Sequence, residues 1–181
     1  MQPTSKPCVL LTGFGPFRQH LVNPSWEAVK GVKASGLLAD VQIHIMEVPV
    51  SYRKAREVIL GMWRSLKPKL AVHFGVAPRS DIIILEQTGK NTKYTDRDIE
   101  GLCPSKGCCV EGGPQQIDSI IDMKAARRLL KLLGLDVLYS RDAGRSEISP
   151  WDTDSTAALI LIKQVLTKAD YATCSQRGCQ S

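Results

Sequence analysis

The chain has 181 residues, of which 43% are hydrophobic, 23% charged and 6% aromatic. A chain of this length can bury a sizeable core, and we expect a single globular domain. The ordinary composition excludes collagen-like, low-complexity and wholly disordered proteins. The longest purely apolar run is residues 157–162. A membrane-spanning helix needs about 20 such residues, so a membrane is not an expected partner.

The charge balance bears on nucleic acids as partners. Lys and Arg number 24 against 18 Asp and Glu, which gives a formal net charge of +6. These basic residues are spread along the chain without interleaved aromatic residues, so we expect no nucleic-acid partner. The densest basic group, Lys124, Arg127, Arg128 and Lys131, fits the solvated side of an expected helix.

The cysteine content bears on compartment and metal binding. The cysteines are Cys8, Cys103, Cys108, Cys109, Cys174 and Cys179. The N-terminus carries no secretory signal, so we expect reduced thiols and a cytoplasmic location. Most zinc knuckles have tighter cysteine spacing, and no metal or other cofactor is expected. The sequence leaves the oligomeric state open.

The first half of the chain predicts alternating strands and helices. Residues 9–12 form a short apolar run typical of a buried strand, and Gly13-Phe-Gly-Pro-Phe17 ends it. A helix is expected to begin at Pro24, with Asn23 as its N-cap. Alternating apolar residues at 41, 43 and 45 predict a second strand. Residues 51–66 carry apolar side chains at helical spacing and predict a second helix.

The alternation continues in the second half. Residues 70–74 and 82–85 are apolar runs that predict buried strands, and the latter ends at Glu86. Residues 87–118 are rich in glycine and proline and are expected to be mostly loop. A helix over 122–133, stopped by Gly134, and a strand over 135–139 follow. This alternation favours an α/β fold with a largely parallel sheet.

The end of the chain has a different pattern. Ser149 can cap a helix, and Pro150 suits its first position. An apolar stripe at helical spacing follows, made of Ala158, Leu161, Ile162, Val165, Leu166 and Ala169. We therefore expect residues 1–145 to form the α/β domain, 146–169 a helix that completes it, and 170–181 a flexible tail.

Three places in the sequence are candidates for chemistry. Phe14 and Phe17 follow a strand on a Gly/Pro turn, where open α/β sheets bind ligands, but both side chains could equally belong to the core. Glu86 ends an apolar strand, and a carboxylate buried there needs a partner. Asp142-Ala-Gly-Arg145 leads from a strand towards an expected helix start at Ser149, a layout that suits a nucleophile.

Several segments together resemble the pyroglutamyl-peptidase I family of cysteine peptidases. The resemblance covers roughly residues 8–145, and the cysteine-containing loop looks like the animal cytosolic form. The matching segments, in chain order, are Val9-Leu-Leu-Thr-Gly-Phe-Gly-Pro-Phe17, Asn23-Pro-Ser-Trp26, Glu47-Val-Pro-Val50, Val72-His-Phe-Gly-Val-Ala77, Glu86 with Gly89 and Asn91, Cys108-Cys-Val-Glu-Gly-Gly-Pro114, Ile117-Asp-Ser-Ile-Ile-Asp122 and Ser140-Arg-Asp-Ala-Gly-Arg145.

The resemblance implies a fold, an activity and roles for single residues. It implies a three-layer α/β/α fold, with a twisted, mostly parallel sheet and helices on both faces. The implied activity is removal of N-terminal pyroglutamyl residues by a Glu, Cys and His triad. Glu86 matches the glutamate, and Phe14 and Phe17 match aromatic residues that line the pocket for the pyroglutamyl ring. Gly75 is expected to open the turn that leads to the glutamate strand.

The sequence departs from the family at both other triad positions. Ile148 stands where the resemblance places the nucleophilic cysteine, and Glu147 replaces an apolar pocket residue. The family's histidine lies on a strand some twenty residues further on, but this sequence has only His20, His44 and His73. An aliphatic side chain cannot attack a carbonyl carbon, and Ser149 without a histidine is a poor nucleophile.

Three interpretations remain open. The first is a catalytically silent chain that keeps part of the pocket for N-terminally pyroglutamylated peptides. The second is an active peptidase with an unforeseen catalytic pair. A third interpretation is a non-enzymatic binding protein, or a form with an altered C-terminus whose new helix leaves a sheet strand unpaired. The chain is also shorter than the family leads one to expect, with the difference after Arg145.

Overall fold

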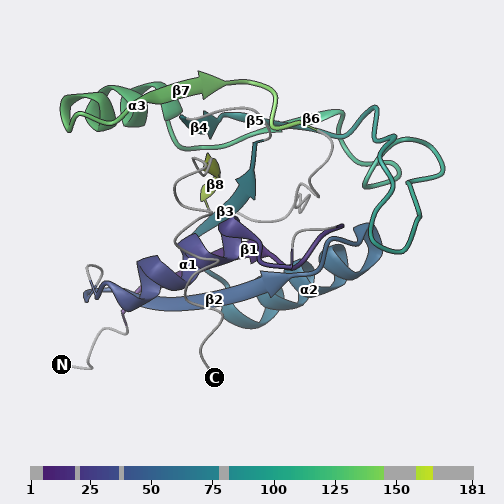
Figure 1. Cartoon of the computed structure of the whole chain (residues 1–181), viewed down its shortest axis with the longest axis horizontal. Helices are drawn as coiled ribbons and strands as arrows, with labels where there is room; N and C mark the ends of the chain where they lie inside the picture. The colour runs from purple at the N-terminus through teal and green to yellow at the C-terminus, as the bar shows by residue number, and fades with distance from the viewer. Residues whose placement is uncertain (1–5, 19–20, 37–38, 78–81, 145–157, 165–181) are drawn as a thin grey trace.

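A computed structural model of the chain describes residues 6–18, 21–36, 39–77 and 82–144 in full, and residues 158–164 by their backbone. These residues form a six-stranded sheet, a separate two-stranded sheet and three helices (Figure 1). The elements are, in chain order, β1 (Cys8–Phe14), α1 (Pro24–Ala34), β2 (Gln42–Val48), α2 (Tyr52–Leu66), β3 (Leu70–Val76), β4 (Ile83–Glu86), β5 (Thr88–Lys90), β6 (Gln116–Asp118), α3 (Met123–Leu132), β7 (Val137–Ser140) and β8 (Ala158–Gln164).

The large sheet is mixed but mainly parallel. Its strand order is β2-β1-β3-β8-β4-β7, and neighbours are parallel except for β8 and β4, which run antiparallel. Parallel neighbours need crossover connections, which α1 and α2 supply between the first three strands. The α/β class and the largely parallel sheet predicted from the sequence are confirmed.

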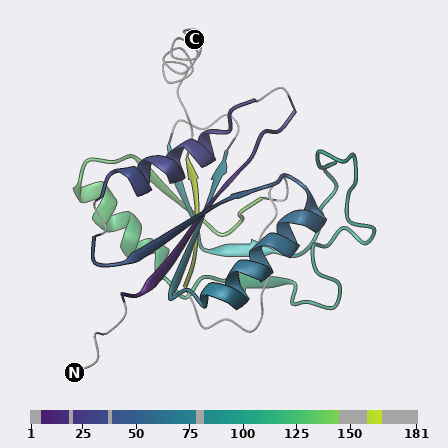
Figure 2. The same cartoon turned by 90° about the horizontal axis from the view of Figure 1, so that it is seen from below.

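Alternate residues of β1 pack against different helices. Leu10 and Phe14 belong to a buried cluster with α2, whereas Val9 and Leu11 belong to a second cluster with α1. Because successive side chains of a strand point to opposite faces, α1 and α2 cover opposite faces of this part of the sheet. Figure 2 shows the two helices on either side of the crossing strands. A third cluster joins α3 to β4 and β7.

The helix starts follow from local side-chain chemistry. Asn23 accepts a hydrogen bond from the backbone N–H of Ser25 at 3.1 Å, and Pro24 is the first residue of α1. Ser51 caps α2, and Asp122 caps α3 by accepting from two backbone N–H groups. Each cap satisfies donors that a helix leaves unpaired at its start. The expected capping by Asn23 is confirmed.

The helix expected near the end of the chain is wrong over Ala158–Gln164. These residues form strand β8, which pairs with β3 on one side and β4 on the other. The run from 157 to 162 is continuously apolar, a pattern that suits a fully buried strand as well as a helix. Backbone pairing on both sides decides between the two. The strand expected to be left unpaired is also wrong, since β8 lies between β3 and β4.

Two smaller expectations also change. The segment over 87–118 contains the paired strands β5 and β6, with Gly89 opposite Ile117. Gly75 lies within β3, opposite Lys163 of β8, and therefore does not open a turn. The expected N-cap Ser149 and the tail over 170–181 lie outside the described residues.

Candidate functional site

Glu86 is a buried carboxylate at the end of β4. Its side chain is 3% exposed, and its backbone lies opposite Leu161 of β8 and Ser140 of β7. The preceding residue, Leu85, packs into the α3 cluster. Since neighbouring strand residues face opposite ways, Glu86 points to the sheet face that α3 does not cover. The structure thus confirms that this carboxylate is buried.

Polar residues line up across the sheet at the level of Glu86. The register pairs Thr12 with His73, His73 with Leu161, and Leu161 with Glu86. Residues paired across neighbouring strands share a face. Thr12 and His73 are 2% and 4% exposed, so the face that holds Glu86 also holds two other buried polar groups.

His73 is neutral and belongs to a pair with Thr12. Its Nδ1 lies 2.6 Å from the hydroxyl oxygen of Thr12. Burial lowers the pKa of His73 to about 3, because the charged imidazolium would lose its hydration. Strand β8 separates His73 from Glu86, and two strand spacings amount to roughly 10 Å. His73 is therefore too far from the Glu86 carboxylate to form a hydrogen bond with it.

The Asp142-Ala-Gly turn is fixed against β5. The backbone N–H of Ala143 donates to the carbonyl oxygen of Thr88 at 3.2 Å, and Lys90 pairs with Asp142 at 2.9 Å. Gly144 has a φ of +81°, a conformation that glycine adopts without strain. The structure therefore holds in place the turn that leads towards position 148. Glu147 and Ile148 themselves lie outside the described residues.

Phe14 and Phe17 have different surroundings. Phe14 is 8% exposed and packs with Leu10 and Trp63 in the α2 cluster. Phe17 is half-buried, and the guanidinium of Arg18 lies 4.7 Å from the centre of its ring. Phe14 thus serves the core, one of the two alternatives left open by the sequence. A pocket role for either side chain stays a prediction.

The turn that carries the two phenylalanines is tightly held. The Phe14 N–H donates to the Ser25 hydroxyl at 2.9 Å, and Asn23 donates to the Gly15 carbonyl at 3.0 Å. A Cβ at Gly13 would lie 2.6 Å from the Ser25 carbonyl oxygen, so only glycine fits between β1 and α1. The N-cap of α1 therefore also positions the turn.

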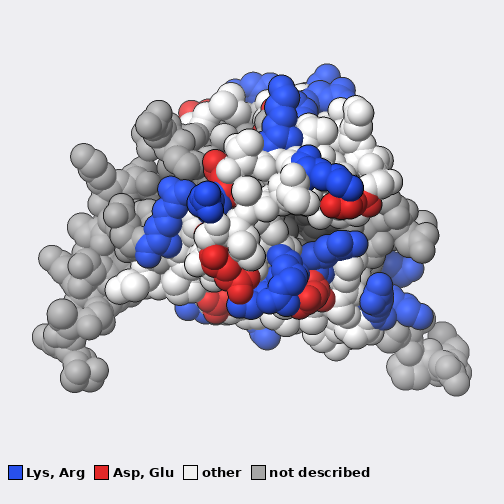
Figure 3. Space-filling model, turned by 90° about the vertical axis from the view of Figure 1, so that its right-hand side faces the viewer, with Lys and Arg blue, Asp and Glu red and all other residues white. Residues whose placement is uncertain are grey.

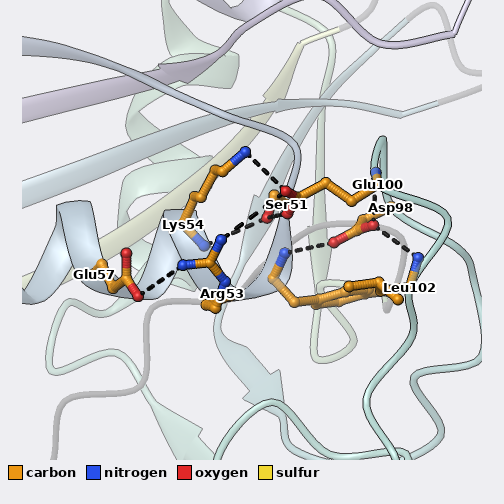
Figure 4. Close-up of polar contacts among 8 residues, drawn as sticks. Ser51, Arg53, Lys54, Glu57, Asp98, Glu100 and Leu102 are labelled. Atoms are coloured by element: carbon orange, nitrogen blue, oxygen red, sulfur yellow. Dashed lines mark hydrogen bonds and ion pairs between the residues drawn. The ribbon is translucent and has the colours of Figure 1, made fainter.

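A charged loop docks on the first turn of α2, and sequence reasoning missed it. Asp98 accepts from the backbone N–H of Tyr52 at 3.1 Å, and Glu100 accepts from the Ser51 hydroxyl at 2.6 Å (Figure 4). Lys54 pairs with Glu100 at 2.8 Å, and its hydrogen bond holds the pKa of Glu100 below the usual range. Acidic residues near a helix N-terminus are a known preference that could have indicated this contact.

The loop also encloses two tyrosines. The rings of Tyr52 and Tyr94 meet edge to face, with centroids 5.9 Å apart, and Tyr94 is 1% exposed. Burial, with nearby Cys109 and Asp96 adding to it, raises the pKa of Tyr52 to about 12. On the side of the molecule that carries this loop, basic and acidic side chains are interleaved (Figure 3). The charged side chains of the described residues on this side are therefore of both signs.

The described residues provide neither a metal cluster nor a spanning helix. No group of three or more His, Cys, Asp or Glu side chains in these ranges is placed to hold a metal ion. The four cysteines in the same ranges, Cys8, Cys103, Cys108 and Cys109, form no disulfide with one another. Every helix in this part of the chain is too short or too polar to cross a membrane.

Comparison with known proteins places this geometry in a family. Residues 7–146 match the pyroglutamyl peptidase family. The chain belongs to this family. It is 45% identical over 139 residues to pyroglutamyl-peptidase 1 from human and from rat, a match that covers 76% of this chain and 66% of those proteins. The human pyroglutamyl-peptidase 1-like protein is 43% identical over 105 residues, covering 58% of this chain and 54% of that protein.

Solved structures agree with the family assignment. The pyrrolidone carboxyl peptidase of Fervidobacterium islandicum has a TM-score of 0.82 and 27% identity, and the match covers 93% of this chain and 85% of that one. The Bacillus amyloliquefaciens pyroglutamyl peptidase I shares the fold, with a TM-score of 0.77 and 24% identity over 91% of this chain and 84% of that one. The family resemblance read from the sequence motifs is confirmed, and it is closer to the animal proteins than to a bacterial relative at 32% identity.

Proposed function

We propose that this chain recognises N-terminal pyroglutamyl groups without hydrolysing the peptide bond that follows them. The observation that carries the proposal is strand β8, which lies directly beside Glu86 and contains no histidine. The resemblance puts the catalytic histidine on a strand that follows the nucleophile position. Position 161, directly opposite Glu86, is leucine, and the nucleophile position, 148, is isoleucine.

The loss of both groups removes the covalent step. A cysteine peptidase needs a thiolate that attacks the carbonyl carbon and an imidazole that moves the proton. Glu86 retains the position of the third group, which orients the imidazole, but it cannot replace either of the others. Removing a triad nucleophile or base lowers the rate by many powers of ten. His73 offers no substitute, because it is buried and β8 separates it from Glu86.

The hydrogen bonds that hold the two turns to which the resemblance assigns the pyroglutamyl ring support the proposal. The turn with Phe14 and Phe17 is held by Ser25 and Asn23, and the Asp142 turn is docked on β5. On this proposal the chain is one three-layer α/β/α domain in the cytosol. Its ligands are peptides whose first residue is pyroglutamate, the substrates of the family, and it needs no cofactor.

Calorimetric titration tests recognition. We expect the native chain to bind a short peptide that begins with pyroglutamate. It should not bind the same peptide beginning with glutamine, because the uncyclised glutamine carries a charged α-amine. Phe17→Ala should weaken binding about tenfold, in line with the loss of one partly buried aromatic contact. Leu102→Ala, a loop leucine that is 59% exposed, is the matched control and should bind as the native chain does. Equal affinity for the two peptides would overturn the proposal.

A further inference from the structure

Three leucines at the C-terminal end of helix α3 are exposed to solvent. Leu129, Leu132 and Leu133 are 64%, 83% and 76% exposed. Their spacing of three and four residues puts them on one side of the helix, and we call them the leucine ridge. Single exposed leucines are ordinary, but an adjacent set of three on one helix marks an interaction surface.

A row of cations runs beside the ridge. Lys124, Arg128 and Lys131 are all exposed, and their spacing of four and three residues forms a second line along α3, which we call the basic stripe. Residues 123–133 contain no Asp or Glu. Among the ion pairs formed between described residues, none involves the basic stripe.

The inner side of the helix is already in use. Met123 is 1% exposed and packs with Leu85 and Val137, while Arg127 donates to the Val137 carbonyl oxygen at 3.0 Å. The ridge, Arg128 and Lys131 therefore occupy exposed positions of a helix that is anchored to the sheet, whereas the Lys124 ammonium reaches back to β7 and lies 5.3 Å from the centre of the Tyr139 ring. Figure 1 shows α3 with β7 at one end of the molecule, far from the charged loop that docks on α2.

We propose that α3 lies against an anionic lipid surface, with the leucine ridge inserted between headgroups and the basic stripe on the lipid phosphates and carboxylates. Leucine on one side and Lys or Arg beside it is the pattern of helices that lie in the membrane interface. The expectation that a membrane is no partner considered only spanning segments. The sequence alone did not show that these leucines are exposed on the folded chain.

Charge and shape favour lipid over the other occupants. A second copy of α3 would bring two basic stripes together without any acidic residue between them, which is repulsive. The three leucines are each more than 60% exposed, so they project as a ridge, which suits insertion between lipid headgroups. The anionic headgroups of a bilayer complement the stripe.

Vesicle sedimentation tests the proposal with the full chain. We expect binding to phosphatidylcholine vesicles that contain about 30% phosphatidylserine, weakening as salt is raised, and little binding to phosphatidylcholine alone. The double variant Arg128→Gln/Lys131→Gln should bind about 25-fold more weakly, about fivefold for each charge. The double variant Arg56→Gln/Arg64→Gln removes the same charge from exposed positions of α2 and should bind as the native chain does.

The leucine variant separates the possible occupants. Leu129→Gln/Leu132→Gln should abolish sedimentation and leave the melting temperature nearly unchanged, because glutamine has about the same helix propensity as leucine. Leu21→Gln, at an 83% exposed position, should change neither. A lowered melting temperature would show that the ridge is buried by the chain itself and would overturn the proposal. Concentration-dependent self-association that disappears in the variant would instead assign the ridge to a second copy. No sedimentation of the folded native chain would also refute the lipid contact.

Discussion

The two halves of the sheet are held together in different ways. Strands β1, β2 and β3 are neighbours in space and follow one another in the chain, with α1 and α2 packed on their two faces. Among the residues that the structure describes, the helix packed on β4 and β7 is α3, over a buried cluster of Leu85, Met123 and Val137. The two halves do not pair directly, since β8 comes from far along the chain and joins β3 to β4.

This difference assigns separate tasks to the two halves. The first half forms from contacts that are close in the sequence, and it carries the phenylalanine turn. The second half carries Glu86 and the Asp142 turn. Within the sheet it is joined to the first half through β8, and outside the sheet the Asp98 loop contacts the first turn of α2. We therefore expect β8 to be the main connection that brings the residues of family chemistry together. A proline variant of β8 tests this dependence directly. The stability predictions that follow it test the comparison of the two halves, from the largest expected effect to the smallest.

The largest effect is expected from a proline in β8. Ile160→Pro breaks β8 where it pairs with Val72 of β3, directly before residues 161–163, which pair with β4, at a cost of about 3 kcal/mol or more. Hydrogen exchange should show lost protection in β4, β7 and α3, with β1 to β3 retaining more of theirs. Ile160→Val keeps the donor and is the control. Native protection of the β4 amides in the proline variant would show that β8 does not join the halves.

A smaller effect is expected from truncating a core side chain in the first half of the sheet. Leu10 is fully buried in the α2 cluster, so Leu10→Ala should lower the free energy of unfolding by about 2–5 kcal/mol. Leu132→Ala makes the same chemical change on the outer side of α3, at 83% exposure, and should cost less than about 0.5 kcal/mol. Urea unfolding measures both values. Comparable losses would contradict the exposure of α3.

How much of the structure could be predicted from the sequence depends on how far apart in the sequence the contacting residues lie. Asn23 caps α1 by accepting from a residue two positions away, so the local sequence was sufficient to predict the cap. Strand β8 pairs with residues far away in the sequence, and an apolar run carries no information about such partners. The contact of Asp98 with Tyr52 joins residues 46 positions apart. It was missed because the preference of acidic residues for helix N-termini does not identify which distant acidic residue docks there.

The candidate site divides in the same way. The burial of Glu86 could be expected from the apolar strand it ends. The burial of His73 beside Thr12, and its separation from Glu86 by β8, required the strand order. The strand pairing also shows that Leu161 lies opposite the Glu86 carboxylate. The family motifs could not show this, because the chain after Arg145 does not match them.

A pH series tests the burial of His73. With a folded-state pKa of about 3 against an ordinary value near 6.5, the unfolded chain binds more protons between these values. The contribution to stability is therefore fully present above pH 6.5 and is lost as the pH falls towards 3. Between pH 7 and 5 the loss is about 2 kcal/mol. His73→Gln should remove this part of the pH dependence, whereas His44→Gln in β2 should retain it. Identical pH dependence in both variants would refute the burial.

Release of a reporter amine from a pyroglutamyl substrate is the most direct test of the central claim. The native chain should release no more amine than buffer does, because isoleucine and leucine stand at positions 148 and 161. The double variant Ile148→Cys/Leu161→His returns a thiol and an imidazole to these positions, and any gain of release there should depend on Glu86. Release by the native chain that Glu86→Gln abolishes would contradict the account.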